Sequence, residues 1–99
     1  MGWAKALSDE VGKDGITVNT VCPGSTRTNR IISLFSETAK QTGQTIEQIE
    51  EISAQKIPMK RIGEPEELAA LIAFLASERA SYMTGLAIQV DGGSARGYY

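Results

Sequence analysis

The stretch PGSTRT at residues 23–28 concentrates small and hydroxylated residues directly after an apolar run. Such residues cannot fill a core, and their amides, carbonyls and hydroxyls can hydrogen-bond a ligand. Pro23 fixes φ and keeps Cys22 extended, while Gly24 lets the backbone approach a planar ligand closely. An apolar strand that ends in this way is typical of one wall of a ligand crevice in an open α/β sheet. The alternative interpretation is an ordinary polar turn.

Several other kinds of chemistry are excluded by residue types that these 99 residues lack. There is no histidine, so Ser-His-Asp and Cys-His nucleophile systems cannot be assembled within the sequence. Because there is also only one cysteine, the usual transition-metal ligand sets are missing and no metal site is expected. Neither GxxxxGK[ST] nor GxGxxG occurs, so the sequence contains no glycine-rich phosphate loop of those kinds.

Length and composition favour a single domain, because 99 residues with 41% apolar content can bury a core. The net charge of −2, with acids and bases interspersed, predicts neither nucleic acid nor an anionic membrane as a partner. No apolar run approaches the roughly 20 residues of a membrane span, and no secretory signal pattern opens the sequence. The single cysteine fits a reducing compartment, so we expect a cytoplasmic protein.

The elements that must position residues 23–28 follow from residue spacing and turn residues. In chain order we expect a helix at Gly2–Val11, a turn at 12–15, a strand at Ile16–Cys22, two helices within Asn29–Lys56, a connector at Ile57–Gly63, a helix from Pro65, a short turn at 77–81 and a strand at Leu86–Val90. A capping-box pattern at residues 45–48 starts the second of the two middle helices. The helix from Pro65 is the strongest, with proline at its first position and apolar residues at helical spacing.

A strand, covering helices, a further helix and a second strand form a crossover unit, so the two strands should be parallel. Two strands alone make a small sheet, and a parallel pair needs helices on both faces. The first strand would also present an unpaired apolar edge. We therefore expect the end of a larger doubly wound sheet, or a partner chain that supplies the missing edge. Within this strand Asn19 is assigned to a structural hydrogen bond rather than to catalysis.

Several segments in this order resemble the C-terminal portion of the short-chain dehydrogenase/reductase family, and most closely its 3-oxoacyl-(acyl-carrier-protein) reductase-like branch. They are ITVNTVCPG followed by STRT, then IPMKRIGEPEELA, FLASERASYMTG and IQVDGG. The resemblance covers residues 2–93. It implies a Rossmann-like α/β fold in which residues 1–99 form one partial domain, with a substrate lid at about residues 29–56.

The resemblance also implies a cofactor, NAD or NADP, and a place for its nicotinamide. By position, Pro23 and Gly24 shape the loop, the backbone of Thr26 takes the carboxamide-binding position, and Thr28 supplies a hydroxyl. Thr26 departs from the usual isoleucine or valine, which matters little if its backbone binds. The family reduces carbonyls or oxidises secondary alcohols of small molecules, and its subunits form homo-oligomers. Cys22 has no neighbouring base in the sequence and is expected to be inert.

No catalytic residue can be assigned in this sequence. The family's hydride transfer needs a glycine-rich loop and a Ser, Tyr, Lys set, but Tyr82, Tyr98 and Tyr99 have no lysine four residues later and Lys5 has no tyrosine four residues before it. One hypothesis is the cofactor-and-lid part of an NAD(P)-dependent oxidoreductase, inactive alone. The other is a non-catalytic association module or truncated gene product that pairs with itself or with an intact relative. Neither the substrate nor the choice between NAD and NADP follows from these residues.

Two further residues are assigned to packing or to the surface. The opening helix resembles the end of the family's subunit-pairing helix, so Trp3 is expected in a core or an interface rather than stacked on a ligand. Arg61 recurs in the family pattern and has two interpretations, an ion pair with a nearby acid or a solvated charge.

Overall fold

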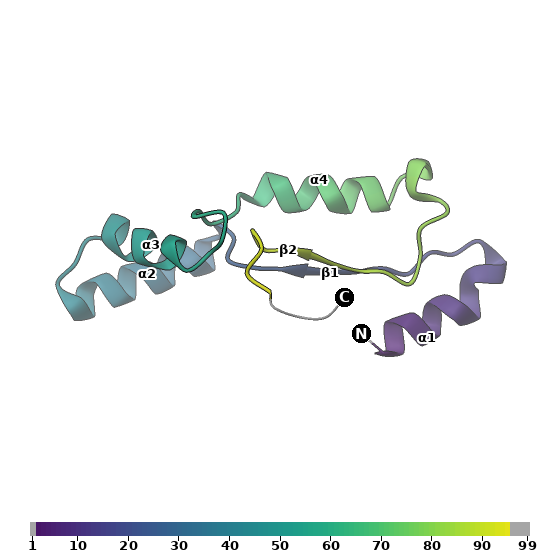
Figure 1. Ribbon diagram of the computed structural model, residues 1–99, viewed down its shortest axis with the longest axis horizontal. Helices are drawn as coiled ribbons and strands as arrows, with labels where there is room; N and C mark the ends of the chain where they lie inside the picture. Colours follow the sequence, from purple (N-terminus) through teal and green to yellow (C-terminus); the bar gives the residue numbers. More distant parts are fainter. Residues whose placement is uncertain (1, 96–99) are drawn as a thin grey trace.

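The computed structural model describes residues 2–95, in which helices lie around and beyond one pair of strands (Figure 1). The elements are α1 (Gly2–Val11), η1 (Gly12–Asp14), β1 (Thr20–Pro23), α2 (Asn29–Thr42), α3 (Ile46–Gln55), α4 (Pro65–Leu75), η2 (Glu78–Ala80) and β2 (Ala87–Val90). The radius of gyration is 17.0 Å, against about 13 Å for a compact domain of this length. The fold is therefore extended, with α2 and α3 at one end, α1 at the other and the strands between them.

The two strands pair in parallel, as the sequence predicts, with Thr20 opposite Ala87 and Pro23 opposite Val90. Each of the predicted helices and strands is present, and the helices over 2–11, 29–42 and 46–55 lie where expected. The 12–15 turn is also present, with Gly15 at φ +72°, where glycine is favoured. The order of elements predicted for the fold is thus confirmed.

The start of the first strand differs from the prediction, since β1 begins at Thr20 rather than at Ile16. The cause lies in the hydrogen bonds. The Val18 amide donates to the side-chain Oγ1 of Thr84 at 2.9 Å, and only at Thr20 does the amide donate to a carbonyl of the partner segment, that of Leu86 at 2.8 Å. β-branched residues predict extended backbone, but the ladder starts only where the partner can pair.

Asn19 makes the structural hydrogen bonds that the sequence predicts. Its Nδ2 donates to the Met83 carbonyl at 3.1 Å, and its Oδ1 accepts from the Leu86 amide at 3.1 Å. The side chain is half-buried and spans the turn that precedes β2. Asn19 therefore adds two side-chain bonds between the backbone bonds that join Val18 to Gly85 and Thr20 to Leu86.

The assignment of Trp3 to a core is wrong for the residues that the structure describes. Leu7 and Val11 are half-buried, but Trp3 is 75% exposed and nothing within residues 2–95 covers it. The other half of the prediction, an interface, stays a prediction. The one fully buried side chain of α1 is that of Ser8, whose hydroxyl donates to the Lys5 carbonyl at 2.7 Å.

The α2–α3 hairpin contains the main apolar core of the described residues. Thr28 caps α2, and Thr45 and Gln48 form the predicted capping box of α3, with bonds of 3.1 and 2.8 Å. The buried cluster consists of Phe35, Ala39, Ile49, Ile57 and Ile62. Because Ile57 and Ile62 belong to the connector, the α2–α3 hairpin is packed onto the segment that leads to α4. The core thus lies beside the strand ends rather than on the sheet.

Helix α4 begins at Pro65 as predicted and runs along the two strands in Figure 1. Its first turn is closed by Glu67, whose Oε1 accepts from the Glu64 amide at 2.9 Å. The apolar stripe is only partly covered, since Ile72 is 50% exposed. One side of α4 is therefore open within the described residues.

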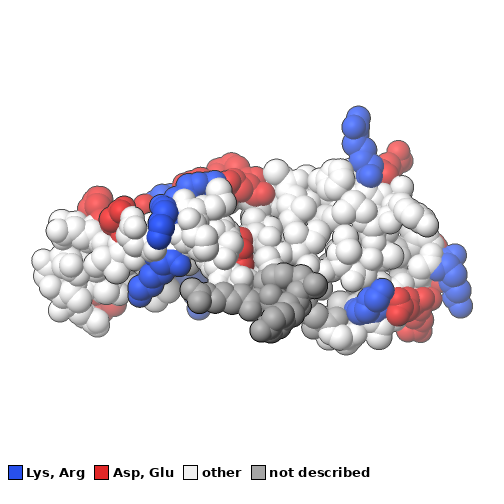
Figure 2. All heavy atoms as spheres, viewed as in Figure 1, with Lys and Arg blue, Asp and Glu red and all other residues white. Residues whose placement is uncertain are grey.

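Charged side chains form small mixed groups on the face shown in Figure 2, and no large area of that face carries one sign. This distribution agrees with the interspersed charges of the sequence. Within residues 2–95, every helix is too short or too polar to cross a bilayer.

Candidate functional site

The loop that follows β1 is held in place by two neighbouring segments. The Gly24 amide donates to the Val90 carbonyl at 2.9 Å and so extends the ladder by one bond. Thr26 and Gly63 form an isolated parallel bridge, in which the Gly63 amide donates to the Ser25 carbonyl at 2.9 Å and the Arg27 amide to the Gly63 carbonyl at 2.8 Å. The loop is therefore fixed between the end of β2 and the connector to α4.

This bridge decides where the backbone of Thr26 points. In a parallel bridge the neighbours of the central residue form the bonds, so the amide and carbonyl of Thr26 face away from Gly63. The carbonyl accepts from the Thr28 amide at 2.8 Å, and Thr26 Oγ1 donates to the Gly24 carbonyl at 3.2 Å. Within residues 2–95 no group accepts a hydrogen bond from the Thr26 amide. That amide is available to a ligand.

All four residues predicted to bind a cofactor line one hollow of about 480 Å³ at the end of β1. The complete lining is Pro23, Gly24, Ser25, Thr26, Thr28, Arg30, Ile31, Leu34, Pro65 and Leu68. One side of the hollow is thus the polar loop, and the rest comes from the first two turns of α2 and the first turn of α4. The polar-turn interpretation does not account for this cavity.

Thr28 has a structural task as well as its predicted one. It is the N-terminal cap of α2, and its Oγ1 accepts from the Ile31 amide at 3.3 Å. A hydroxyl that accepts in this way still has a proton to donate. Thr28 can therefore cap the helix and donate into the hollow at once.

Gly24 is required by its packing against Asp91, the residue that follows β2. A Cβ at this position would lie 2.6 Å from Asp91 Cβ and 2.8 Å from Asp91 Cα. From the sequence, glycine is expected here because it lets the backbone approach a ligand closely. The structure gives a second reason for glycine, since the ends of β1 and β2 meet here and leave no room for a side chain.

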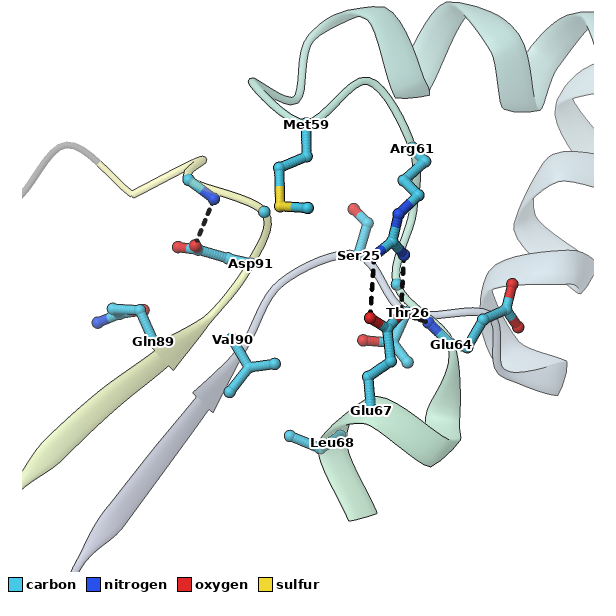
Figure 3. Close-up of a pocket in the computed structure, with 13 residues that line it drawn as sticks. Ser25, Thr26, Met59, Arg61, Glu64, Glu67, Leu68, Gln89, Val90 and Asp91 are labelled. Carbon is cyan, nitrogen blue, oxygen red and sulfur yellow. Dashed lines mark hydrogen bonds and ion pairs between the residues drawn. The ribbon is translucent and has the colours of Figure 1, made fainter. Parts of the chain in front are cut away.

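A second hollow, of about 250 Å³, adjoins the first and is drawn in Figure 3. Its lining includes Ser25, Thr26 and Leu68, which the first hollow shares. Its charged groups already have partners, since Asp91 Oδ1 accepts from the Gly93 amide at 2.9 Å. The ordered loop that follows β2 is therefore held by Asp91 itself.

Arg61 pairs with Glu67 in this second hollow, with its two terminal nitrogens donating to the two carboxylate oxygens at 2.7 and 2.9 Å. The ion-pair interpretation of Arg61 is thus confirmed. This hydrogen bonding lowers the pKa of Glu67 from 4.5 to about 2. The pair therefore adds stability above pH 4.5, which is lost as the pH falls from 4.5 toward 2. The gain is small because both side chains are half-exposed.

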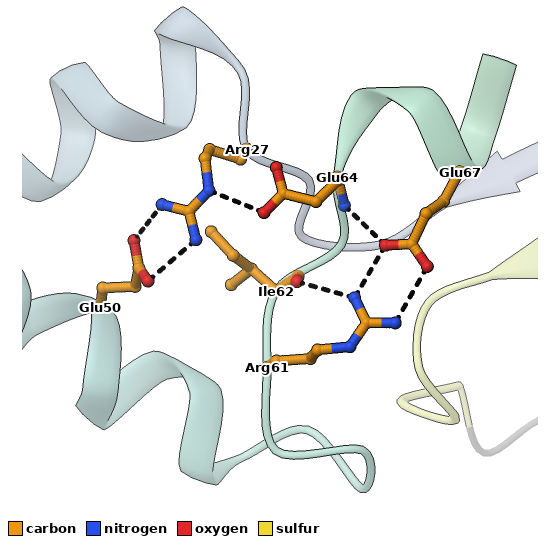
Figure 4. Close-up of polar contacts among 6 residues, drawn as sticks. All are labelled: Arg27, Glu50, Arg61, Ile62, Glu64 and Glu67. Atoms are coloured by element: carbon orange, nitrogen blue, oxygen red, sulfur yellow. Dashed lines mark hydrogen bonds and ion pairs between the residues drawn. The ribbon is translucent and has the colours of Figure 1, made fainter.

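Arg27 forms a second and longer-range ion-pair group (Figure 4). Its Nη1 and Nη2 donate to the two carboxylate oxygens of Glu50 at 2.6 and 3.1 Å, and its Nε donates to Glu64 Oε1 at 2.9 Å. Hydrogen bonds with Glu50 first, and with Glu64 second, raise the pKa of Arg27 above its usual value. One side chain thus contacts α3 and the residue that precedes α4.

Sequence reasoning missed the part of the first hollow that comes from other elements. Leu68 and Pro65 were interpreted only as helix residues, and Arg30, Ile31 and Leu34 only as lid residues. These residues all lie near the start of α2 or α4, and both helices begin beside the loop. Their nearness to a helix start was therefore the signal that could have marked them as lining residues. The Arg27 pairs had no such signal, since Glu50 and Glu64 lie 23 and 37 residues away.

Comparison with known proteins gives a consistent match along the sequence. The family model described as enoyl-(acyl carrier protein) reductase matches residues 1–95. The chain is 44% identical over 93 residues to the NADPH-dependent reductase BacG of Bacillus subtilis, covering 94% of this chain and 36% of BacG. It is 38% identical over 98 residues to the 3-oxoacyl-(acyl-carrier-protein) reductase MabA of Mycobacterium tuberculosis, covering 99% of this chain and 35% of MabA.

A solved structure agrees at the level of the fold. L-sorbose reductase from Gluconobacter frateurii, complexed with NADPH and L-sorbose, superposes with a TM-score of 0.90 at 39% identity, covering 97% of this chain and 37% of that one. The predicted Rossmann-like architecture is thereby confirmed. The chain spans about a third of the length of these relatives.

Proposed function

This chain belongs to the short-chain dehydrogenase/reductase family, and from that premise we propose that it is the cofactor-and-lid part of an NAD(P)-dependent oxidoreductase. The complete protein would reduce a carbonyl or oxidise a secondary alcohol of a small molecule, with a 3-oxoacyl-(acyl-carrier-protein) substrate as the finer proposal. The observation that carries the proposal is the hollow of about 480 Å³, which gathers Pro23, Gly24, Thr26 and Thr28. Among the described residues, the Thr26 amide there has no hydrogen-bond partner.

The residues present fit a nicotinamide carboxamide. The Thr26 amide can donate to the carboxamide oxygen, and the Thr28 hydroxyl has a proton to donate in the same hollow. Gly24 and Pro23 hold the loop at the carboxyl end of β1, where open α/β sheets bind ligands. When bound, the nicotinamide supplies the hydride donor or acceptor. These residues orient it, and the Ser, Tyr, Lys set of the family is not among the 99 residues.

A chimera tests this proposal. Residues 2–95 would replace the matching segment of BacG, and NADPH-dependent turnover would be measured with BacG's own substrate. We expect turnover from the chimera and none from the 99-residue chain alone, because residues that act as a unit leave little activity when most are absent. Thr28→Val in the chimera is expected to raise KM for NADPH about tenfold, the effect of one lost hydrogen bond.

Matched variants separate binding from helix capping. Thr28→Ser keeps the hydroxyl and should stay within about threefold of the parent chimera. Thr45→Val removes the cap of α3 without touching the hollow, so KM for NADPH should not change. An inactive but folded chimera, or equal effects of Thr28→Val and Thr45→Val on KM, would count against the proposal.

A second candidate function is association without catalysis, with itself or with an intact relative. The observation in its favour is that β1 pairs with one strand only among residues 2–95, while Ile72 and Phe74 on α4 are 50% and 41% exposed. Unpaired edges and open apolar faces favour association. We expect the 99-residue chain to form homo-oligomers in analytical ultracentrifugation, and a well-folded monomer would contradict this.

A cytoplasmic location is proposed from the single cysteine.

A further inference from the structure

We propose that Arg27 is a positioning residue, which fastens the α2–α3 hairpin to the loop at residues 24–28. The proposal rests on the function proposed above, because it gives the covering hairpin a mechanical link to the nicotinamide site. Arg27 does not line either hollow, so it would act through its neighbours Thr26 and Thr28.

The backbone of Arg27 is fixed on the loop side of this link. Its amide donates to the Gly63 carbonyl at 2.8 Å, within the parallel bridge between Thr26 and Gly63. A displacement of the Arg27 side chain would therefore pull on backbone that directly adjoins the amide proposed to bind a ligand. The loop has little slack in which to absorb such a displacement, because Gly24 is also bonded to β2.

The side chain of Arg27 reaches two separate elements. Its bidentate contact to Glu50 joins α3, and its Nε contact to Glu64 joins the residue before α4 (Figure 4). A planar guanidinium suits this geometry, since its donors lie in a fixed fork that can serve two carboxylates. The side-chain exposures are 39% for Arg27 and 29% for Glu50, so the contact is partly shielded from solvent.

The Arg27–Glu50 contact is the feature that links α3 to the loop at residues 24–28. Within residues 2–95, the Arg27–Glu50 pair is the one side-chain hydrogen-bond contact that joins α3 to the 24–28 loop. The Arg61–Glu67 pair has a similar bidentate geometry, at 2.7 and 2.9 Å, but joins the connector to α4. Arg61 therefore provides a matched control, with the same chemistry and no contact to α3.

The experiment measures amide hydrogen exchange by NMR in the 99-residue chain. Arg27→Met and Glu50→Gln should each quicken exchange of the α3 amides about tenfold. The double variant should quicken it by about the same factor, because both substitutions remove the same contact to α3, that between Arg27 and Glu50. Arg61→Met should leave α3 exchange within about threefold. The α3 exchange rate of Arg27→Lys should lie between those of the parent chain and Arg27→Met, since lysine keeps the charge but lacks the forked guanidinium.

A second readout separates positioning from general stability. Glu50→Gln should shift the amide resonances of Thr26 and Thr28 in the parent chain, and should no longer shift them in the Arg27→Met background. Loss of stability alone would not produce this dependence. The proposal would be overturned if the effects of Arg27→Met and Glu50→Gln on α3 exchange multiplied in the double variant. It would also be overturned if Arg61→Met quickened α3 exchange as much as Arg27→Met does. Because Glu50→Gln is nearly isosteric, it decides the question even if Arg27→Met does not fold.

Adding NADP⁺ distinguishes this proposal from the proposed function. In the chimera with BacG, which supplies the family residues that the 99-residue chain lacks, we expect NADP⁺ to shift the Thr26 and Thr28 amides, with affinity reduced about tenfold by Arg27→Met and unchanged by Arg61→Met. Coupled exchange without any NADP⁺ shift would support the link and count against the cofactor site. NADP⁺ binding that Arg27→Met leaves unchanged would overturn the positioning role alone.

Discussion

Replacing Gly24 with alanine is expected to lower the free energy of unfolding by about 2–3 kcal/mol, at the upper end of overpacking penalties. The new Cβ would lie 2.6 Å from Asp91 Cβ and 2.8 Å from Asp91 Cα. Backbone atoms cannot rotate away as a flexible side chain can, so the ends of β1 and β2 would have to separate. Urea unfolding followed by circular dichroism measures the loss.

The matched control is Gly12→Ala. No atom lies within 4 Å of the position that its Cβ would take, and φ at Gly12 is in the ordinary range. Its free energy of unfolding should stay within about 0.5 kcal/mol of the parent. Equal stability of the two variants would show that the contact between Gly24 and Asp91 is loose.

Asn19→Ala is expected to cost about 2 kcal/mol of folding free energy, because it removes two hydrogen bonds worth about 1 kcal/mol each. The lost partners are the Met83 carbonyl and the Leu86 amide, each at 3.1 Å. The turn before β2 should loosen as a result. Denaturant unfolding gives the total cost, and amide exchange at Leu86 locates it.

Thr84→Val serves as the comparison variant for Asn19→Ala. Thr84 Oγ1 accepts one hydrogen bond in the same region, from the Val18 amide at 2.9 Å. Its removal should cost about 1 kcal/mol, half the effect of Asn19→Ala. If both variants unfold at the parent's midpoint, the side-chain bonds before β2 contribute nothing to stability.

The order of elements could be predicted because the residues concerned act locally. Pro65 and the capping box at 45–48 mark helix starts through contacts within one turn, and Gly15 marks a turn through its own backbone conformation. The start of β1 could not be predicted in this way. Whether Ile16 or Thr20 opens a ladder depends on the partner segment near Leu86, about 70 residues away in sequence.

For a similar reason, only the loop residues of the candidate site could be predicted from the sequence. Thr26 and Thr28 lie in one short stretch, so a family pattern and residue chemistry both mark them. Arg27 lies between them, but its role depends on Glu50 and Glu64, which only the folded chain brings near. For Trp3 only the core half of the prediction is wrong, since the described residues leave this side chain 75% exposed, and the interface half stays a prediction.

The placement of the core in the α2–α3 hairpin has a consequence for the order of folding. α2 and α3 are adjacent in sequence and close on Phe35 and Ile49, whereas β1 pairs with β2 across 67 residues. Closing the longer loop costs more chain entropy, and non-local contacts form slowly. We therefore expect the hairpin to collapse first and to serve as the nucleus on which the strands later meet. In this chain the α2–α3 hairpin would form before the hollow at the end of β1.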